Sequence, residues 1–447
     1  MKTIQRLLLP VLFSFSLLSC SKGDNNNNDE LKLAKEYTYS VMTDIYYWYK
    51  DVPGNINPDP IKTLENYFDT LLVAKDRWSW MMKGEEYLSM ESGVYKIFGA
   101  SFAQPIDHYN DYSIRVKFVF DNSPMSENGV KRGYELTHLN GTSVSTLIQN
   151  GTINSALARE SNTFTFKDYS GKSFSFSASA REVSTRSVLK SMVITPSDYT
   201  GLQNNVGYIN YYTFNQNMTS DIDNAIELFR SANIKELILD LRYNGGGDGD
   251  ALEYLADLIS PEQANGQVLG KRKHNDRYSQ YDNNASTMTV ISRKSNALSL
   301  NRIFILTSGA TASASEVLIN GLDPIMNIIQ LGKRTYGKPN GMYVIPYPAN
   351  NYTSPKYVLL PICFYTVNKN GFGDYESGIN PDHTRPDDLY HDFGPQEDWI
   401  SSCLSYIVNG TFPALPSVTF QTKSGSANGV IQRDEEKPGY GKLIYKF

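Results

Sequence analysis

The sequence predicts a multidomain protein of the α/β class. Its 447 residues allow two or three domains at roughly 100–200 residues each. Between residues 186 and 415, short apolar segments alternate with helical ones, which predicts a mostly parallel sheet covered by helices on both faces. Hydrophobic residues make up 40% of the chain and charged residues 20%, a composition that can form a sizeable core.

Residues 1–19 are expected to be a lipoprotein signal peptide. Lys2 and Arg6 precede an apolar stretch, Leu7 to Leu18, that is too short to span a bilayer. The stretch ends in Leu-Leu-Ser-Cys, which resembles a bacterial lipobox and implies lipidation of Cys20. An ordinary signal peptide with a chance cysteine is the alternative.

A polar tether, residues 20–30, follows the lipobox and contains four consecutive asparagines. In outline it resembles the export signal of Bacteroidetes surface lipoproteins. We therefore expect a protein of the cell envelope, lipid-anchored to the outer membrane at its periplasmic face or at the cell surface. The membrane is then a partner through the acyl chains on Cys20.

The charge of the chain argues against a nucleic-acid partner. Removal of residues 1–19 takes away two positive charges, so the net charge falls from −5 to −7. The five histidines are scattered and no cysteine–histidine cluster has metal-ligand spacing, so neither a metal nor another cofactor is expected. Cys363 and Cys403 lie in apolar surroundings and could be either a disulfide or two free thiols.

Residues 31–93 are expected to form an N-terminal helical domain. Apolar side chains recur there at helical spacing, and the pattern is interrupted between Pro53 and Pro60. The recurring positions are Leu31, Ala34, Tyr37, Val41 and Ile45.

Residues 94–185 resemble a PDZ domain. Gly99-Ala100-Ser101-Phe102 is similar to the loop whose backbone N–H groups receive a peptide C-terminus. Asn140-Gly141 indicates a hairpin turn further along the same region. The resemblance implies binding of substrate C-terminal ends at residues 99–102, and the alternative is that this domain only packs on the core.

The elements of residues 186–415 follow from periodicity and from turn residues. Residues 265–300 are polar and are expected to be an irregular arm or flap. Residues 416–447 have no assignment. The expected strands are 206–211, 237–241 and 303–306, and the expected helices are 221–231, 251–259 and 315–322.

Ser313 and Lys338 carry the chemistry that this region can perform. A serine hydroxyl needs a neighbouring base, and a lysine is a base only when burial keeps it neutral. Ser313 lies just before a predicted helix, whose free N–H groups can face an oxyanion. The glycines 245–247 follow a predicted strand and let backbone amides approach a substrate carbonyl.

Three segments in order, Asp-Leu-Arg-Tyr-Asn-Gly-Gly-Gly at 240–247, Ala-Ser-Ala-Ser-Glu at 312–316 and Gly-Lys at 337–338, resemble the C-terminal processing peptidases, or tail-specific proteases. The resemblance implies that Ser313 is the nucleophile and Lys338, 25 residues later, is the base. It implies oxyanion donors at the amides of Gly246 and Ala314, with Gly247 as an alternative to Gly246.

One departure from that family concerns the residue that orients the lysine. The family usually has a glutamine four residues after the lysine, and this chain has Met342 there. Methionine cannot hydrogen-bond as an amide does, so either another group holds Lys338 or activity is weakened.

The expected function is therefore serine endopeptidase activity of the C-terminal processing type, acting on proteins or peptides through an acyl-enzyme. A catalytically weak or inactive relative that binds a peptide or an apolar ligand is the alternative. A third alternative, glycan capture, rests only on abundant tyrosine and the lipobox. Neither the natural substrate nor the oligomeric state follows from the sequence.

Overall fold

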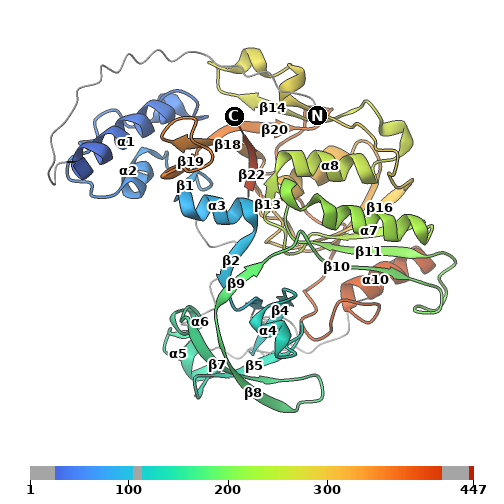
Figure 1. Ribbon diagram of the computed structural model, residues 1–447. Coiled ribbons are helices and arrows are strands. Elements are labelled where there is room, and N and C mark those ends of the chain that lie inside the picture. The colour runs from blue at the N-terminus through green and yellow to red at the C-terminus, as the bar shows by residue number, and fades with distance from the viewer. Residues whose placement is uncertain (1–25, 104–112, 415–441, 447) are drawn as a thin grey trace.

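The computed structural model describes residues 26–103, 113–414 and 442–446. It contains helices and sheets in three connected parts, with a PDZ-like region at one end and the sheets of the core at the other (Figure 1). The prediction of a multidomain α/β protein is confirmed. None of the helices in the described ranges combines the length and the apolar character that crossing a bilayer requires.

The N-terminal part contains three α-helices and one short 3₁₀ helix, labelled η1, as well as a strand that the periodicity did not indicate. Helices α1 and α2 pack against each other, and Thr63 caps α2 by accepting a hydrogen bond from the amide of Asn66 at 3.2 Å. Strand β1 pairs antiparallel with β19 of the core, so this part extends a core sheet. The bounds are α1 Asn26–Met42, η1 Tyr49–Asp51, α2 Leu64–Leu71, β1 Trp80–Lys83 and α3 Gly84–Ser92.

The PDZ-like region is a sheet in the order β3-β4-β5-β7-β8, with β6 paired to β5. The expected turn is present, since Asn140 and Gly141 both have positive φ angles between β5 and β6. An antiparallel pair, β2 and β9, leads into and out of the sheet. The bounds are β2 Val94–Ile97, β3 Ala100–Ala103, β4 Ile114–Val119, α4 Pro124–Glu127, β5 Glu135–Leu139, β6 Thr142–Ser143, α5 Val144–Gln149, α6 Ile153–Leu157, β7 Ser161–Lys167, β8 Ser173–Ser179 and β9 Arg181–Ser184.

The first core sheet has the order β10-β11-β12-β16-β17-β21, and only the β10–β11 pair is antiparallel. Alternate residues of its strands enter two separate apolar clusters, one with helices α7 to α9 and the other with α10. The sheet is thus covered on both faces, as predicted. The bounds are β10 Val188–Ile194, β11 Val206–Tyr211, η2 Gln216–Met218, α7 Thr219–Ser231, β12 Glu236–Asp240, α8 Gly249–Ile259, β16 Arg302–Thr307, α9 Ala314–Leu322, β17 Asn327–Gly332, β21 His383–Thr384 and α10 Asp398–Asn409.

A second core sheet is mixed and was not predicted. Its main path is β1-β19-β18-β20-β14-β15, and β22 pairs with both β13 and β18. The expectation of an irregular arm at 265–300 is wrong, because β14 in that segment is hydrogen-bonded to β20 and β15. The bounds are β13 Gly246–Asp248, η3 Glu262–Ala264, β14 Val268–His274, η4 Ser279–Tyr281, η5 Ala285–Thr287, β15 Met288–Val290, β18 Asn340–Tyr347, β19 Tyr357–Leu360, β20 Ile362–Val367 and β22 Lys442–Lys446.

Candidate active site

Ser313 lies in the connection between β16 and α9, immediately before the first residue of the helix. Its φ of 59° and ψ of −111° belong to a region that residues with a Cβ rarely adopt. The residue is completely buried, and its hydroxyl has no hydrogen-bond partner among the described residues. A strained backbone and an unpaired buried hydroxyl are features that cluster at functional sites.

Lys338 lies just before β18 and is also completely buried. Burial lowers the pKa of its ammonium to about 7, an effect that the negative charges of Asp76 and Glu316 partly oppose. Its Nζ atom donates a hydrogen bond to Oδ1 of Asn340 at 3.3 Å. A large fraction of Lys338 is therefore neutral near neutral pH, as a general base requires.

The carboxylate of Glu316, in the first turn of α9, joins the serine loop to the lysine loop. Its Oε2 atom accepts hydrogen bonds from the backbone amides of Ser313 and Lys338, each at 2.8 Å. Its Oε1 atom accepts from the amide of Gly337 at 2.7 Å and from the hydroxyl of Thr335 at 2.5 Å. We call this arrangement the Glu316 clamp.

The Glu316 clamp brings the two predicted catalytic residues together. Because both amides donate to one oxygen atom at 2.8 Å, the nitrogens of Ser313 and Lys338 are no more than about twice that distance apart. No hydrogen bond joins the two side chains, because the Ser313 hydroxyl has no partner among the described residues and Nζ of Lys338 donates to Asn340. The two residues are thus brought close through their backbones, and their action as a catalytic dyad stays a prediction.

The glycines predicted to supply an oxyanion donor lie in β13. The amide of Gly246 donates to Oδ1 of Asn244 at 2.8 Å, so it must leave that oxygen before it can serve an oxyanion. Gly247 has a φ of 144°, and a Cβ there would lie 1.9 Å from the carbonyl oxygen of Phe214. Only glycine fits at 247, and its amide remains the alternative donor.

The amide of Ala314 is the other predicted oxyanion donor. Ala314 is the first residue of α9, a position whose N–H has no acceptor within the helix. Asn244 holds this turn against the glycine strand, because its carbonyl oxygen accepts from the amide of Ala312 and from the hydroxyl of Ser315, both at 3.1 Å.

The N-terminal part contributes to the lysine side of the site. Nη2 of Arg77 donates to the carbonyl oxygens of Gly337 at 2.9 Å and Glu376 at 2.8 Å, and its guanidinium lies 5.0 Å from the ring centroid of Tyr336. Arg77 therefore helps to fix the loop that carries Lys338. Sequence reasoning missed this role because no local pattern links residue 77 to residue 337.

Met342, which stands where relatives have glutamine, is buried in an apolar cluster with N-terminal helices and β19. The acceptor for the lysine is Asn340, two residues nearer in sequence. Sequence reasoning also missed Glu316, although its place three residues after Ser313 is the spacing of a capping box.

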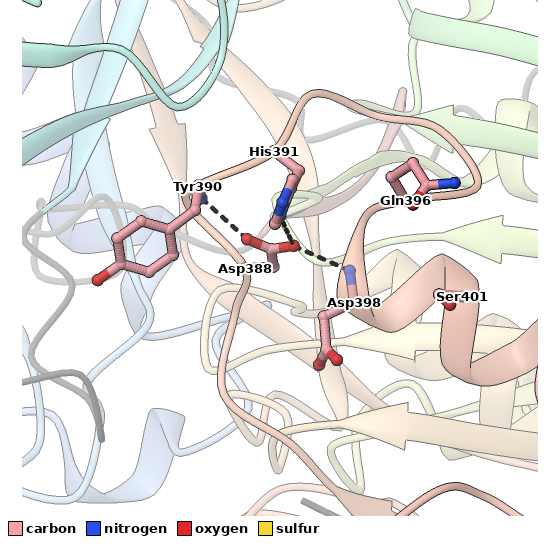
Figure 2. A pocket seen from close by; sticks show the side chains of 6 residues that line it. All are labelled: Asp388, Tyr390, His391, Gln396, Asp398 and Ser401. Carbon is pink, nitrogen blue, oxygen red and sulfur yellow. Dashed lines mark hydrogen bonds and ion pairs between the residues drawn. The ribbon is translucent and has the colours of Figure 1, made fainter. Parts of the chain in front are cut away.

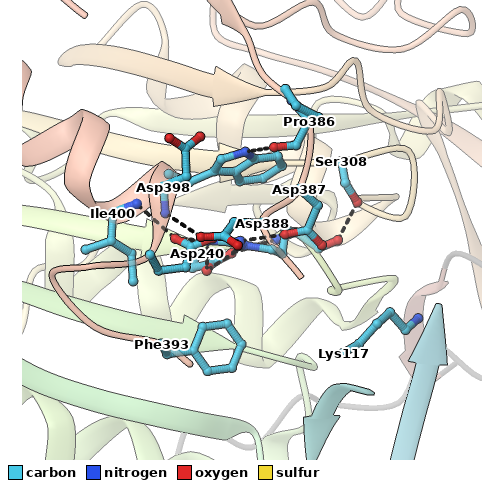
Figure 3. Close-up of polar contacts among 12 residues, drawn as sticks. Lys117, Asp240, Ser308, Pro386, Asp387, Asp388, Phe393, Asp398 and Ile400 are labelled. Atoms are coloured by element: carbon cyan, nitrogen blue, oxygen red, sulfur yellow. Dashed lines mark hydrogen bonds and ion pairs between the residues drawn. The ribbon is translucent and has the colours of Figure 1, made fainter. Parts of the chain in front are cut away.

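The PDZ-like region is joined to the core by a cluster of buried charges (Figure 3). Arg132 donates to Asp387 at 3.0 Å, and Arg242 donates to the same Oδ1 atom at 2.8 Å. Arg242 also forms buried ion pairs with Asp240 and Glu397. Buried charges of this kind fix a geometry because separating any partner leaves an unpaired charge.

The predicted peptide-binding loop of the PDZ-like region lies far along the chain from Ser313. Gly99 has a φ of 91° and precedes β3, which ends the sheet among the described residues. Ala100, Ser101 and Phe102 belong to β3 and pair with β4. The structure thus places residues 100–102 on a strand at the end of the described sheet, with Gly99 just before it, and their binding role stays a prediction.

A separate pocket of about 280 Å³ lies beside α10 and contains none of the predicted catalytic residues (Figure 2). Nδ1 of His391 and the amide of Asp398 both bond to Oδ2 of Asp388, at 2.7 and 2.9 Å, on one side of it. The lining residues are Asp388, Tyr390, His391, Gln396, Asp398 and Ser401.

The structure describes two of the three cysteines. Cys363 and Cys403 are buried free thiols, and burial raises the pKa of the Cys363 thiol to about 12. Cys20, the predicted site of lipidation, lies outside the described residues.

Comparison with known families gives two matches. The profile of Peptidase family S41 matches residues 205–384, which include Ser313 and Lys338. The profile of the Peptidase S41 N-terminal domain matches residues 34–80. Residues 205–384 of the core and residues 34–80 of the N-terminal part thus match models of the same peptidase family.

Two curated relatives and one solved structure are similar to this chain. Carboxyl-terminal-processing peptidase 2 of the Arabidopsis thaliana chloroplast is 32% identical over 133 residues, 30% of this chain and 24% of that protein. The carboxy-terminal-processing protease of Bartonella bacilliformis is 23% identical over 384 residues, 83% of this chain and 80% of that protein. A structure from Bacteroides fragilis assigned to the S41 proteases shares the fold, with a TM-score of 0.66, 22% identity, and coverage of 84% of this chain and 97% of that one.

Proposed function

This chain belongs to peptidase family S41, and from that premise we propose that it is a serine endopeptidase whose nucleophile is Ser313 and whose base is Lys338. Membership of the family implies a serine-type hydrolase that acts on proteins. The assignment of Ser313 and Lys338 as the catalytic pair goes beyond what family membership implies. It is supported chiefly by the Glu316 clamp, which holds the backbone of a serine with an unpaired hydroxyl close to that of a lysine whose pKa burial lowers to about 7.

The reaction begins with a proton transfer. The neutral amine of Lys338 accepts the proton of the Ser313 hydroxyl as the Oγ atom attacks the carbonyl carbon of the scissile peptide bond. Backbone amides of Ala314 and of Gly246 or Gly247 stabilise the negative oxygen of the tetrahedral intermediate. The ammonium of Lys338 then gives its proton to the leaving amine, which leaves an ester on Ser313.

The second half of the reaction regenerates the serine. A water molecule gives a proton to Lys338 as its oxygen attacks the ester carbon, and the new tetrahedral intermediate collapses to release the carboxylic acid. The proton returns from Lys338 to the Oγ atom of Ser313. Asn340 keeps the amine oriented in both halves, because its Oδ1 atom accepts a hydrogen bond from Nζ of Lys338.

Substrate selection is proposed to use the PDZ-like region. An extended peptide can add to the edge of β3 that pairs with no other strand of the described residues, with its terminal carboxylate at the amides of residues 99–102. The buried ion cluster formed with Arg132 and Asp387 fixes this region relative to the core. The preferred substrates are then proteins whose C-terminal ends reach the PDZ-like region.

The protein is also proposed to be a lipoprotein of the cell envelope, anchored to the outer membrane by acyl chains on Cys20. The support is the lipobox-like sequence at residues 17–20. Cys20→Ser removes the acceptor for the lipid and should move the protein from the membrane fraction to the soluble fraction. An unchanged membrane pool after fractionation would argue against lipidation.

The activity itself is tested with a labelled protein substrate and the variant Ser313→Ala. Loss of the nucleophile should reduce the rate by about 10⁴-fold or more, with an unchanged circular dichroism spectrum. Ser315→Ala is the matched control and should keep most of the activity. Ser315 lies two residues from Ser313, and its hydroxyl donates a hydrogen bond to the carbonyl oxygen of Asn244. Cleavage by Ser313→Ala within tenfold of the wild-type rate would refute Ser313 as the nucleophile, and absence of cleavage by the wild type would favour the alternative of a ligand-binding relative.

A further inference from the structure

Strand β22, residues 442–446, lies between two strands that begin at the active site. It pairs in parallel with β13, with Gly246 opposite Lys442, Gly247 opposite Leu443 and Asp248 opposite Ile444. It pairs in parallel with β18 on its other side, with Met342 opposite Ile444 and Val344 opposite Lys446. Figure 1 shows β22 in red between these two strands.

The reaction centre lies at one end of this three-stranded arrangement. Strand β13 begins at Gly246, a predicted oxyanion donor, and β18 begins at Asn340, two residues after Lys338. The register places Lys442 beside Gly246 on one side and, two residues before the Met342–Ile444 pair, level with Asn340 on the other. The first residue of β22 is therefore at the catalytic end, and the strand runs away from it.

The other edge of β13 is already occupied. The carbonyl oxygen of Gly246 accepts from the amide of Phe214 at 3.1 Å, and the amide of Asp248 donates to the carbonyl oxygen of Phe214 at 2.8 Å. Because backbone groups alternate in direction along a strand, the N–H and C=O of Gly247 point to the opposite side, toward β22. Strands β13 and β18 thus face each other across a slot that is one strand wide.

We propose that this slot binds the extended backbone of the substrate and that residues 442–446 are an internal ligand that competes for it. The proposal rests on the proposed peptidase function and adds its regulation. Proteins recognise extended peptides by adding them to exposed strand edges, and the slot offers two such edges next to Ser313. The complete burial of Ser313 and Lys338 agrees with a site that is occupied in this structure.

An internal ligand has a specific kinetic signature. It competes with substrate at every protein concentration, because it is part of the same chain. At saturating substrate the slot is fully taken by substrate, so kcat does not change. Removal of the internal ligand therefore lowers KM and leaves kcat unchanged.

The experiment compares the full chain with a variant that lacks residues 442–447, using an internally quenched peptide substrate. We expect KM to fall by about fivefold or more at constant kcat. The synthetic hexapeptide Lys-Leu-Ile-Tyr-Lys-Phe, which has the sequence of residues 442–447, should then inhibit the shortened variant competitively. A scrambled hexapeptide of the same composition is the control and should not inhibit.

A second variant covers the case in which the shortened chain does not fold. Leu443→Pro in the full chain removes a backbone donor from the middle of β22 and should lower KM in the same way, with a thermal melt as the check on folding. Unchanged KM in folded variants, together with no competition by the hexapeptide, would overturn the proposal.

The two proposals fail in different ways. If no protein shows cleavage that depends on Ser313, the peptidase function fails. The slot is then judged by fluorescence anisotropy of the labelled hexapeptide on the variant that lacks residues 442–447 and carries Ser313→Ala. Saturable binding of the hexapeptide, not shared by the scrambled one, supports the slot as a strand-binding site, and absence of binding overturns it.

Discussion

Nζ of Lys338 donates a hydrogen bond to Oδ1 of Asn340 at 3.3 Å, and both residues are completely buried. The side-chain amide that orients the lysine is thus present in this protein, at a position two residues from the lysine. The methionine at 342 belongs to an apolar cluster and has no part in that contact. An amide acceptor thus stands two residues after the lysine, whereas the family pattern described above has one four residues after it.

Asn340→Ala should lower kcat by about tenfold to a hundredfold, which is part of what a well-placed general base contributes. Steady-state kinetics at several pH values are the measurement. Asn340→Asp keeps an acceptor but adds a negative charge, so it should raise the pKa of Lys338 and move the rise of activity to higher pH. A purely structural role for Asn340 would leave the pH profile unmoved.

Met342 provides the matched comparison for Asn340. Met342→Leu keeps an apolar side chain of similar volume and should leave activity close to that of the wild type. Met342→Gln in the Asn340→Ala background restores an amide at the position that relatives use and should recover part of kcat. Loss of activity in Met342→Leu with no effect in Asn340→Ala would show that the acceptor has been misassigned.

The pH profile of the wild type follows from the burial of Lys338. Its pKa lies near 7, and only the neutral amine accepts a proton, so kcat/KM should rise with pH through about 7 to a plateau. For a lysine with the ordinary pKa of about 10.4, the rise in kcat/KM would lie about three pH units higher.

The variant Lys338→Arg also tests whether Lys338 is the general base. Arginine keeps its positive charge at all accessible pH values, so this variant should be inactive from mildly acidic to alkaline conditions. Activity of Lys338→Arg, or a wild-type profile that is flat over this range, would identify another residue as the base.

Glu316→Ala should destabilise the protein, because it leaves three buried backbone amides and the hydroxyl of Thr335 without their acceptor. A buried donor without a partner costs about 1–3 kcal/mol, so a loss of roughly 3 kcal/mol or more in the free energy of unfolding is expected. Urea denaturation measures it. Ser315→Ala, in the same helical turn, is the control and should lose much less.

The first core sheet could be predicted because its signals are local. Segments such as 206–211 and 237–241 are apolar and bounded by turns, and they alternate with amphipathic helices. The second sheet could not be predicted in the same way. Its strands pair residues far apart in the chain, for example Trp80 with Leu360, and 265–300 is polar because β14 and β15 lie near one border of that sheet.

In the candidate site, too, features with local signals could be predicted and features that depend on the tertiary fold could not. Ser313 and Lys338 could be named from their residue types and from the resemblance of the segments around them to the C-terminal processing peptidases. The groups that position them could not be predicted. Arg77 reaches Gly337 only through the tertiary fold, and the family pattern places the amide acceptor at residue 342 and not at Asn340. The unassigned residues 416–447 contain β22, whose pairing with β13 and β18 depends on edges that no local pattern reveals.

The Glu316 clamp has a consequence for how the protein can evolve. Its hydrogen bonds to residues 313 and 338 are made by their backbone amides and not by their side chains. The architecture would tolerate alanine and methionine at these positions, and it would gain stability, since an unpaired buried hydroxyl and a desolvated amine both oppose folding. Selection for shape alone would not favour Ser313 and Lys338, so their presence agrees with the proposed peptidase function.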